Sequence, residues 1–319
     1  MEETITAKVF IDGEAGTTGL QIRNRLANRD DVSLLHLGDA ERKDTICRAE
    51  MLNTADLVIL CLPDDAARQA VELIHNPETR VVDASTAHRT AEGWVYGFPE
   101  YAPDQRAAIA DAKRVTNPGC YAITSVAMLH PLVQAGIIGA DWPVTINAIS
   151  GYSGGGKGLI KAFEDENSAD YIETPFYPYS LTLAHKHVPE ITRWSGISHA
   201  PVFVPSVGRY AQGMIVQVPL PLWSMPGKPT PADAHAALAT HYAGQKFVTV
   251  AAIGETATMS KLEPEALNGT NELRLHVFAN EQSSQAVIMG LLDNLGKGAS
   301  GQAVQNLNIM LGLSEEAGI

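Results

Sequence analysis

The sequence contains only three cysteines in 319 residues, Cys47, Cys61 and Cys120, and none of them belongs to a CxxC or Cys/His zinc pattern. This argues against a disulfide framework and against a structural zinc site. No apolar run reaches the roughly 18 residues that suggest a membrane-spanning helix. The N-terminus lacks the cationic and apolar regions of a secretory signal. The sequence therefore predicts a soluble protein of a reducing cytoplasm.

Basic residues are scarce, because 23 Lys and Arg stand against 36 Asp and Glu and give a formal net charge of -13. Nucleic acids and anionic membranes attract proteins with a surplus of Lys and Arg, so neither is expected as a partner. An anionic small molecule would need a local cluster of basic side chains. The hydrophobic share of 45% is enough to bury a sizeable core, and the length favours two domains.

Short apolar segments alternate with amphipathic ones in the first part of the chain. Strands are expected at 8–12, 32–37, 55–62 and 79–83, with helices between them. Continuous apolar strands that alternate with helices are typical of a parallel sheet covered on both faces. Residues 1–118 therefore predict an α/β, doubly wound Rossmann domain that binds a dinucleotide.

The pattern changes after residue 118, where the strands lengthen and Pro- and Gly-rich loops separate them. Strands at 143–150, 213–220, 246–252 and 271–279 favour an α+β domain with a mostly antiparallel sheet. Two further helices are expected, at 283–296 and at 302–311. No internal repeat or coiled-coil heptad is present.

Three glycines follow the first strand in the pattern G-x-x-G-x-x-G, at Gly13, Gly16 and Gly19. Small residues there let the backbone approach a pyrophosphate, whose charge the N-terminus of a helix favours. The alternative is a tight turn between strand and helix that binds no ligand.

The choice of nicotinamide cofactor depends on the end of the second strand. Asp39 could bind the adenosine ribose of NAD, whereas Arg42 and Lys43 suit the 2′-phosphate of NADP. We expect NADP(H). The alternative is that both cations belong to a solvated face.

Cys120 follows Asn117-Pro118-Gly119 and precedes a helical pattern at 121–132, so it is expected at the N-terminus of a helix. Backbone amides and the positive end of the helix dipole stabilise a thiolate there, and Gly119 leaves room for a substrate. These features favour a nucleophile. The alternative is a small residue that fills a turn.

A nucleophilic cysteine needs a proton partner, and His185 and His187 in the segment AHKHVPEI are the candidates. With Glu190 they could also bind a metal, but this short stretch supplies three ligands and no further ligand is evident. We therefore expect no metal. A surface pair without a role remains the alternative to an acid/base.

The segment GYSGGGKG at 151–158 approaches the P-loop pattern but has Gly158 where the pattern needs Ser or Thr. A nucleotide kinase or an ATPase is therefore not expected. Ser153 and Gly154 could still contact the nicotinamide end of a cofactor or a bound substrate. The alternative is a flexible turn.

Eight motifs in order resemble those of the N-acetyl-γ-glutamyl-phosphate reductases in their shorter bacterial form, over nearly the whole chain. They are IDGEAGTTG, LPDDAA, VVDASTAHR, WVYGFPE, NPGCYAITS, SGYSGGGKG, HKHVPEI and GKGASGQAVQNLNIMLGL. The resemblance implies an aspartate-semialdehyde-dehydrogenase-like oxidoreductase of arginine biosynthesis. With NADPH it would reduce N-acetyl-L-glutamyl 5-phosphate to N-acetyl-L-glutamate 5-semialdehyde and inorganic phosphate, through a cysteinyl thioester.

The resemblance also implies an organisation for the chain. Residues 1–118, with about 297–319 packed back onto them, would bind the dinucleotide. Residues 119–296 would form the catalytic and oligomerisation domain. The protein is expected to be a cytoplasmic homo-oligomer, either a dimer or a tetramer.

Single residues acquire roles from the same resemblance. Cys120 matches the nucleophile, and His185 with His187 matches the segment of the acid/base, with His185 favoured. The expected substrate contacts are Arg89, Asn117 and Arg209. The expected cofactor contacts are Gly13, Gly16, Thr17, Thr18, Gly19, Arg42, Lys43, Ser153, Gly154, Asn294, Lys297 and Gln302.

Two alternatives to this function stay open. A reductase of aspartyl phosphate or aminoadipyl phosphate would share the chemistry and the cofactor and would differ only in the acyl pocket. A Rossmann protein that senses NADP(H) without turnover would have no use for Cys120 or for the histidine pair.

Overall fold

The computed structural model describes residues 6–38 and 40–319. Asp39, considered above as a ribose contact, therefore lies outside the described residues. The chain divides into two compact units, Met1–Gly119 with Ala299–Ile319, and Cys120–Gly298. No helix of the described residues has both the length and the apolar character needed to cross a membrane.

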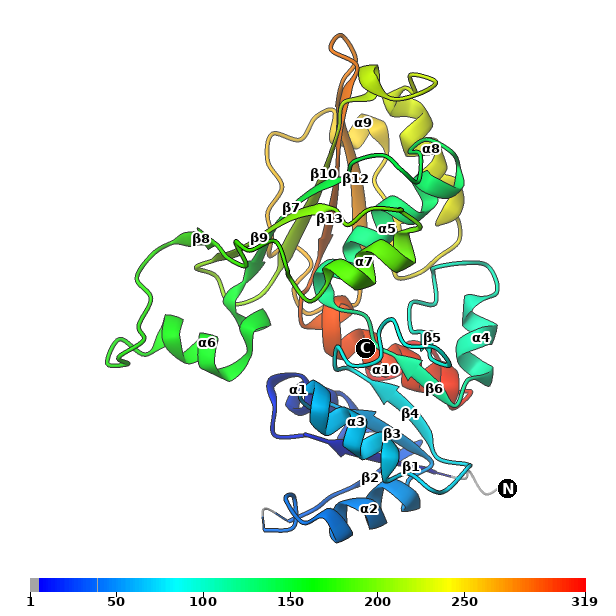
Figure 1. Ribbon diagram of the computed structural model, residues 1–319, viewed down its shortest axis with the longest axis vertical. Coiled ribbons are helices and arrows are strands. Elements are labelled where there is room, and N and C mark those ends of the chain that lie inside the picture. Colours follow the sequence, from blue (N-terminus) through cyan, green and yellow to red (C-terminus); the bar gives the residue numbers. More distant parts are fainter. Residues whose placement is uncertain (1–5, 39) are drawn as a thin grey trace. The chain divides into compact units, whose positions relative to one another are not determined.

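The first unit contains a six-stranded parallel sheet, sheet A, with the strand order β2-β1-β3-β4-β6-β5 (Figure 1). Its strands are β1 (Ala7–Asp12), β2 (Val32–Leu35), β3 (Leu57–Leu60), β4 (Arg80–Asp83), β5 (Val95–Tyr96) and β6 (Arg114–Thr116). The helices of this unit are α1 (Thr17–Leu26), α2 (Thr45–Thr54), α3 (Asp64–Glu72), α4 (Gln105–Asp111) and α10 (Gly301–Met310).

Sheet A is covered by helices on both faces. Successive residues of each strand point to opposite faces, so each strand contributes to both cores. In β1, Val9 and Ile11 join a core cluster with residues of α1, α4 and α10. Phe10, between them, joins a second cluster with residues of α2 and α3. The prediction of a doubly wound α/β fold is confirmed.

The second unit contains a seven-stranded mixed sheet, sheet B, with the order β11-β12-β13-β10-β7-β9-β8. Its strands are β7 (Thr145–Gly151), β8 (Phe176–Pro178), β9 (Val202–Gly208), β10 (Met214–Leu220), β11 (Val248–Val250), β12 (Leu273–Asn280) and β13 (Gln285–Leu292). Its helices are α5 (Cys120–Gln134), α6 (Gly156–Glu164), α7 (Val188–Ser195), α8 (Pro231–His241) and α9 (Ile253–Thr256). Most neighbouring strands are antiparallel, as the sequence predicts.

The prediction of a helix at 283–296 is wrong. Residues 285–292 form β13, which pairs with β12 on one side and with β10 on the other. Ser284 makes the turn into this strand with a positive φ of 48°. An apolar run of this length fits a strand or a helix equally well, and pairing with two neighbours decides for the strand.

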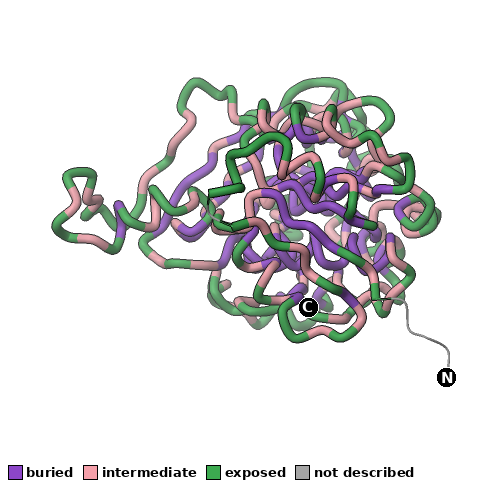
Figure 2. Tube along the Cα trace, turned by 90° about the horizontal axis from the view of Figure 1, so that it is seen from below, coloured by how far each residue is buried: buried purple, intermediate pink, exposed green. Residues whose placement is uncertain are grey.

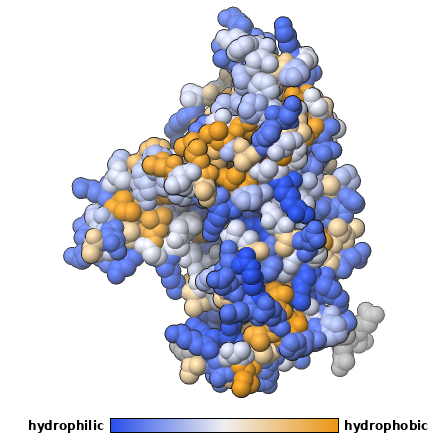
Figure 3. Space-filling view, viewed as in Figure 1, coloured by the Kyte–Doolittle hydropathy of each residue, from blue (hydrophilic) through white to orange (hydrophobic). Residues whose placement is uncertain are grey.

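Apolar residues lie mainly in the interior of the two units. Figure 2 shows buried residues in the interior and exposed ones along the outer loops. Figure 3 shows hydrophilic residues over much of the face that it draws, with hydrophobic residues gathered in a few patches. Large hydrophobic side chains that remain exposed include Ile46, Leu181 and Trp223.

Helix α5, which begins at Cys120, packs against β10 and β13 and is flanked by α7 and α8. Every residue from Tyr121 to Leu132 is buried. Gly290 of β13 permits this contact, because a Cβ at that position would overlap Cγ2 of Thr124. A Cβ at Gly298 would lie 2.8 Å from Cβ of Cys120. Two glycines thus set how closely the chain packs around the first turns of α5.

Substitution of Gly290 therefore has a predictable cost. We expect G290A to lower the free energy of unfolding by about 1–3 kcal/mol, because the added methyl group overpacks the contact with Thr124. G158A is the matched control, since a Cβ at that position of α6 meets nothing within 4 Å. Urea unfolding of both variants measures the difference. An equal stability for the two variants would contradict the packing described.

Candidate active site

The glycine loop joins β1 to α1 and leaves no room for side chains at two of its positions. Gly13 has a φ of +92°, and a Cβ there would overlap the carbonyl oxygen of Cys61. A Cβ at Gly19 would overlap the carbonyl oxygen of Gly13. Gly16 is the N-cap of α1, and no side chain of the described residues caps the helix. Because the first amides of a helix lack partners within it, this end of α1 suits an anion.

A cavity of about 320 Å³ lies beside the glycine loop. Three basic side chains, Arg42, Lys43 and Arg48, are among the residues that line it. Arg42 Nη2 donates to Glu14 Oε1 at 3.2 Å, and Arg48 Nη2 lies 2.7 Å from Asp12 Oδ2. The local cluster of cations that an anionic ligand requires is thus present in this acidic chain.

Cys61 lies on the other side of the Gly13 turn, and its environment argues against a chemical role. Desolvation, followed by the carboxylates of Asp83 and Asp12, raises the pKa of its thiol to about 12. The thiolate is therefore disfavoured, and we interpret Cys61 as a packing residue.

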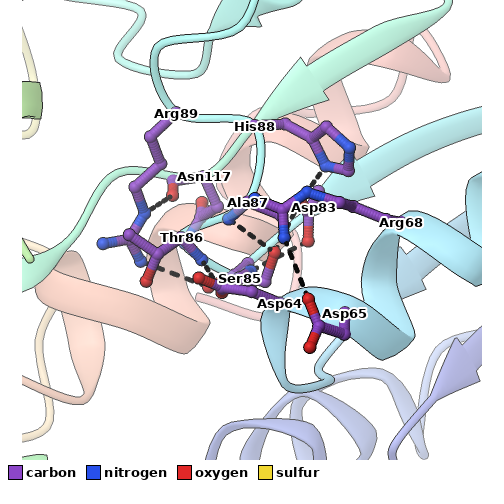
Figure 4. Close-up of polar contacts among 11 residues, drawn as sticks. Asp64, Asp65, Arg68, Asp83, Ser85, Thr86, Ala87, His88, Arg89 and Asn117 are labelled. Carbon is purple, nitrogen blue, oxygen red and sulfur yellow. Dashed lines mark hydrogen bonds and ion pairs between the residues drawn. The ribbon is translucent and has the colours of Figure 1, made fainter.

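The loop that follows β4 is organised by one buried carboxylate, Asp83 (Figure 4). Asp83 is fully buried and accepts hydrogen bonds from the backbone N and the Oγ of Ser85, both at 2.8 Å. His88 Nδ1 lies 2.6 Å from Asp83 Oδ2, and the His88 ring stacks on Trp94 with the centroids 4.2 Å apart. These contacts hold both ends of the loop 83–88.

Arg89 and Asn117, both expected as substrate contacts, lie together in the first unit. Arg89 Nε donates to the carbonyl oxygen of Asn117 at 3.2 Å, and Nη2 donates to that of Ala84 at the same distance. The backbone N of Asn117 donates to the carbonyl oxygen of Asp83 at 2.7 Å. Figure 4 shows Arg89 reaching from the β4 loop to Asn117, three residues before Cys120.

Gln302 of α10 carries a buried polar atom that the chain does not satisfy. Its Nε2 donates to the carbonyl oxygen of Gly97 at 2.9 Å. Its Oε1 is buried and has no hydrogen-bond partner within residues 6–38 and 40–319. Since buried acceptors are nearly always paired, this oxygen is suited to accept a hydrogen bond from a ligand.

In the second unit, Cys120 is the first residue of α5 and is partly exposed. Its position at the N-terminus of a 15-residue helix favours the thiolate. The three cysteines, all within the described residues, form no disulfide. The predicted placement of Cys120 at a helix start agrees with the structure.

Tyr121, the neighbour of Cys120, is surrounded by the histidine pair. The Tyr121 ring lies 5.9 Å from each of the rings of His185 and His187, and the two histidine rings are 4.7 Å apart. Tyr179 Oη lies 3.4 Å from both Tyr121 Oη and His185 Nε2. The structure therefore gathers His185, His187 and Tyr179 around Tyr121, the residue next to the candidate nucleophile.

Both tyrosines of this cluster stay protonated. Burial raises the pKa of Tyr179 to about 12, and burial together with the neighbouring Tyr179 and Cys120 raises the pKa of Tyr121 well above its usual range. Each hydroxyl can therefore donate one hydrogen bond, and Tyr121 Oη donates to the carbonyl oxygen of Ser206 at 3.2 Å. Tyr179 Oη then donates to Tyr121 Oη.

One hydrogen bond fixes the tautomer of His185. The backbone N–H of His187 donates to His185 Nδ1 at 3.1 Å, so Nδ1 must be unprotonated. The neutral ring then carries its proton on Nε2 and points it at Tyr179 Oη, whose own proton is directed to Tyr121.

Other expected cofactor contacts lie in the second unit. Asn294 Nδ2 donates to Ser153 Oγ at 3.0 Å, and Asn294 Oδ1 accepts from the backbone N of Gly213 at 2.7 Å. Gly154 is beside Asn294, because a Cβ there would lie 3.4 Å from its Nδ2. Lys297 is fully buried, with Nζ 5.5 Å from the centre of the Phe247 ring.

Arg209 occupies a different setting from Arg89. Its guanidinium lies over the rings of Phe163 and Tyr171, 5.4 and 5.5 Å from their centres. Its Nη1 donates to the carbonyl oxygen of Phe163 at 3.4 Å, and its Nη2 donates to that of Ile172. Arg209 thus organises the segment around α6 in addition to any contact with a ligand.

Sequence reasoning assigns no role to Tyr121 or to Tyr179. Asp83 and His88 were not considered as an organising pair. A sequence signal existed only for Tyr121, which follows the candidate nucleophile directly. No cluster of three or more His, Cys, Asp or Glu side chains that could hold a metal occurs in the described residues.

Two protein-family models match the chain. The one described as "Semialdehyde dehydrogenase, NAD binding domain" matches residues 8–109. The one described as "Semialdehyde dehydrogenase, dimerisation domain" matches residues 120–294.

Curated proteins named N-acetyl-gamma-glutamyl-phosphate reductase are similar to the chain over nearly its whole length. The protein from Trichormus variabilis is 51% identical over 318 residues, which cover 98% of this chain and 99% of the relative. The protein from Burkholderia cenocepacia is 53% identical over 309 residues, covering 97% and 98%.

Solved structures of aspartate semialdehyde dehydrogenases share the fold. Enzyme II from Vibrio cholerae, complexed with ASA, has a TM-score of 0.70 at 14% identity, over 96% of this chain and 98% of that chain. The enzyme from Candida albicans with NADP has a TM-score of 0.63 at 14% identity, with the same coverage. At these identities the likeness shows the fold alone.

The tautomer of His185 can be measured directly. At neutral pH, nitrogen NMR of the histidine rings should show His185 with a protonated Nε2 and an unprotonated Nδ1, because Nδ1 accepts from the backbone. The H185Q variant assigns the signal, and Y179F should move the Nε2 resonance more than the Nδ1 resonance. A His185 ring protonated on Nδ1 would contradict the geometry.

Proposed function

The chain belongs to the N-acetyl-γ-glutamyl-phosphate reductase family, and we propose that it catalyses the NADPH-dependent reduction of N-acetyl-L-glutamyl 5-phosphate. The products are N-acetyl-L-glutamate 5-semialdehyde and inorganic phosphate, in arginine biosynthesis. The observation that carries the proposal is the position of Cys120 at the start of α5, beside the histidine–tyrosine cluster. A binding protein without turnover has no need of this arrangement.

The dinucleotide-binding role belongs to residues 1–118 with about 297–319, and the catalytic role to residues 119–296. The residues of the first unit fit NADP(H). The glycine loop and the uncapped start of α1 suit the pyrophosphate, and Arg42 with Lys43 in the adjoining cavity suits a 2′-phosphate. Gln302 Oε1 would accept a hydrogen bond from the carboxamide of the nicotinamide. The bound cofactor supplies the hydride.

Cys120 would carry the acyl group. Its thiolate attacks the acyl carbon of the substrate, the carbon–oxygen bond to the phosphoryl group breaks, and phosphate leaves. The resulting thioester is reduced by hydride transfer to its carbonyl carbon, and the thiohemiacetal collapses to the aldehyde and the thiolate. Backbone amides at the start of α5 are placed to stabilise the oxyanion that forms in both steps.

The resemblance and the geometry favour different histidines for the acid/base role. The resemblance favours His185, but a proton on both nitrogens of that ring would break the hydrogen bond from the backbone N of His187. We therefore assign proton transfer to His187 and assign to His185 the orientation of Tyr179. H187N is expected to reduce turnover more than H185N does, and the reverse order would return the role to His185.

Three polar side chains are assigned to the substrate. Asn117 and Arg89 would contact the acyl phosphate, since a phosphate needs fixed hydrogen-bond donors and cations. Arg209, held over two aromatic rings, is assigned to an anionic group of the substrate. For the cofactor, Ser153, Asn294 and Lys297 are proposed as contacts at the nicotinamide end.

Oligomer formation is indicated by the match of residues 120–294 to a dimerisation domain. We assign a homodimer or a homotetramer, and sedimentation equilibrium distinguishes them from a monomer. A cytoplasmic location is assigned because the nucleophilic thiol needs a reducing compartment. Cell fractionation tests that assignment.

The function itself is tested by assaying the purified enzyme in the oxidative direction. N-acetylglutamate semialdehyde, aspartate semialdehyde and aminoadipate semialdehyde are each supplied with phosphate and NADP⁺. We expect a kcat/KM for the N-acetylated substrate at least about 100-fold above the others, a discrimination of roughly 2.7 kcal/mol. Preference for another semialdehyde would contradict this function and indicate that the chain acts on the corresponding acyl phosphate.

Cysteine variants complete this assay. C120S is expected to lose about 10³-fold or more in kcat, because serine is a much weaker nucleophile at neutral pH. C47S makes the same change in α2 and should retain wild-type turnover. Normal turnover by C120S would contradict the covalent route.

A further inference from the structure

We propose that Asn306, on the C-terminal helix α10, is a positioning residue that fixes the orientation of the Asn117 amide and presents its N–H to the substrate. The proposal rests on the proposed function, in which Asn117 contacts the acyl phosphate. Asn306 lies 186 positions after Cys120 in the sequence, within the motif GKGASGQAVQNLNIMLGL, and sequence reasoning assigns it no role.

The contacts of Asn306 determine which of its atoms is the nitrogen. Asn306 is fully buried, and its Nδ2 donates to the carbonyl oxygen of Gly97 at 2.9 Å and to Asn117 Oδ1 at 3.1 Å. A backbone carbonyl can only accept, so the atom that faces Gly97 must be the amide nitrogen. The Asn117 atom that receives its other proton must then be the oxygen. The absence of a side chain at Gly97 allows this approach, since a Cβ there would overlap Asn306 Nδ2.

The opposite end of the Asn117 amide is fixed by a second carbonyl. Asn117 Nδ2 donates to the carbonyl oxygen of Ala299 at 3.0 Å. A flip of the amide would therefore face nitrogen to nitrogen at Asn306 and oxygen to oxygen at Ala299. The backbone of Asn117 is also held, by Asp83 and Arg89. The orientation of this side chain is thus set by its surroundings before any substrate binds.

The fixed orientation leaves a hydrogen-bond donor for the substrate. Asn117 Nδ2 carries two protons, and its contacts with the described residues use one of them. The acyl oxygen gains negative charge when the Cys120 thiolate attacks, so a donor stabilises the transition state and an Asn117 oxygen in that place would oppose it. Asn306 should therefore affect turnover more than binding.

Asn308 offers a control on the same helix. It is fully buried, and its Nδ2 donates to the carbonyl oxygens of Glu315 and Ala317 at 3.1 and 2.9 Å. Its Oδ1 accepts from Arg29 Nη1 at 2.7 Å. Asn306 Oδ1 likewise accepts a hydrogen bond, from Gln302 Nε2 at 3.4 Å, so truncation to alanine removes a comparable set of hydrogen bonds at either position. Of these two side chains, only that of Asn306 contacts Asn117.

The test is a double-mutant cycle in the semialdehyde assay. We expect N306A to lower kcat about 10- to 100-fold, with KM for NADP⁺ within about twofold of wild type. This is less than the roughly 10²- to 10³-fold loss of an oxyanion donor itself, because N306A leaves the Asn117 amide in place. N308A should keep kcat within about twofold. In an N117A background, N306A should lower kcat by less than about twofold further, because its effect passes through Asn117. Thermal unfolding of each variant measures the loss of stability separately, and N306S replaces N306A if the alanine variant does not fold.

Two results would overturn the proposal. One is an equal loss of kcat in N306A and N308A, which would make the effect one of stability. The other is an undiminished loss from N306A when Asn117 is already alanine, or a wild-type kcat in N117A itself. Wild-type and C120S enzymes are assayed in parallel, so that failure of the covalent reaction is seen separately from failure of the role of Asn306.

Discussion

Helix α5 lies directly on strand β13, and the closeness of that contact governs where Cys120 can be. A side chain at Gly290 would overlap Thr124, one turn along the helix from Cys120. Twelve successive residues of α5 are buried, and burial of these side chains fixes the position of the helix. A cysteine on the first residue of such a helix combines a rigid support with a local field that favours its thiolate.

In the first unit, polar groups rather than apolar packing fix the position of a candidate site segment. Asp83 is fully buried and collects donors from Ser85 and His88, while its carbonyl oxygen accepts from Asn117. Burial of a carboxylate is costly unless its oxygens are paired, and the pairing here orders a loop at the carboxyl end of β4. In open α/β sheets this edge is where ligands bind.

Much of the fold could be predicted from the sequence. The first four strands of sheet A are short apolar runs separated by helical patterns, and this alternation is typical of a parallel sheet covered on both faces. The segment 283–296 could not be assigned, because the run QAVIMGLL fits either period and only the neighbours β10 and β12 decide. The local sequence pattern does not predict which strands pair when they are distant in the chain.

Some features of the candidate site could likewise be predicted from the sequence, and others could not. Cys120 could be placed at a helix start from Asn-Pro-Gly and the apolar run that follows. The tautomer of His185 could not be predicted, since it depends on one backbone N–H two residues away. The role of Asn306 depends on contacts with Gly97 and Asn117, both about 190 or more positions earlier in the chain.

The covalent intermediate is the central claim, and mass spectrometry tests it most directly. The enzyme is mixed with N-acetylglutamate semialdehyde and NADP⁺ without phosphate, so that the thiohemiacetal is oxidised to a thioester that phosphate cannot release. The expected result is one N-acetylglutamyl group on the peptide that contains Cys120, removed when phosphate is added and missing in C120S. NADPH formation with no acyl group on that peptide, or with the group on another residue, would contradict the role of Cys120.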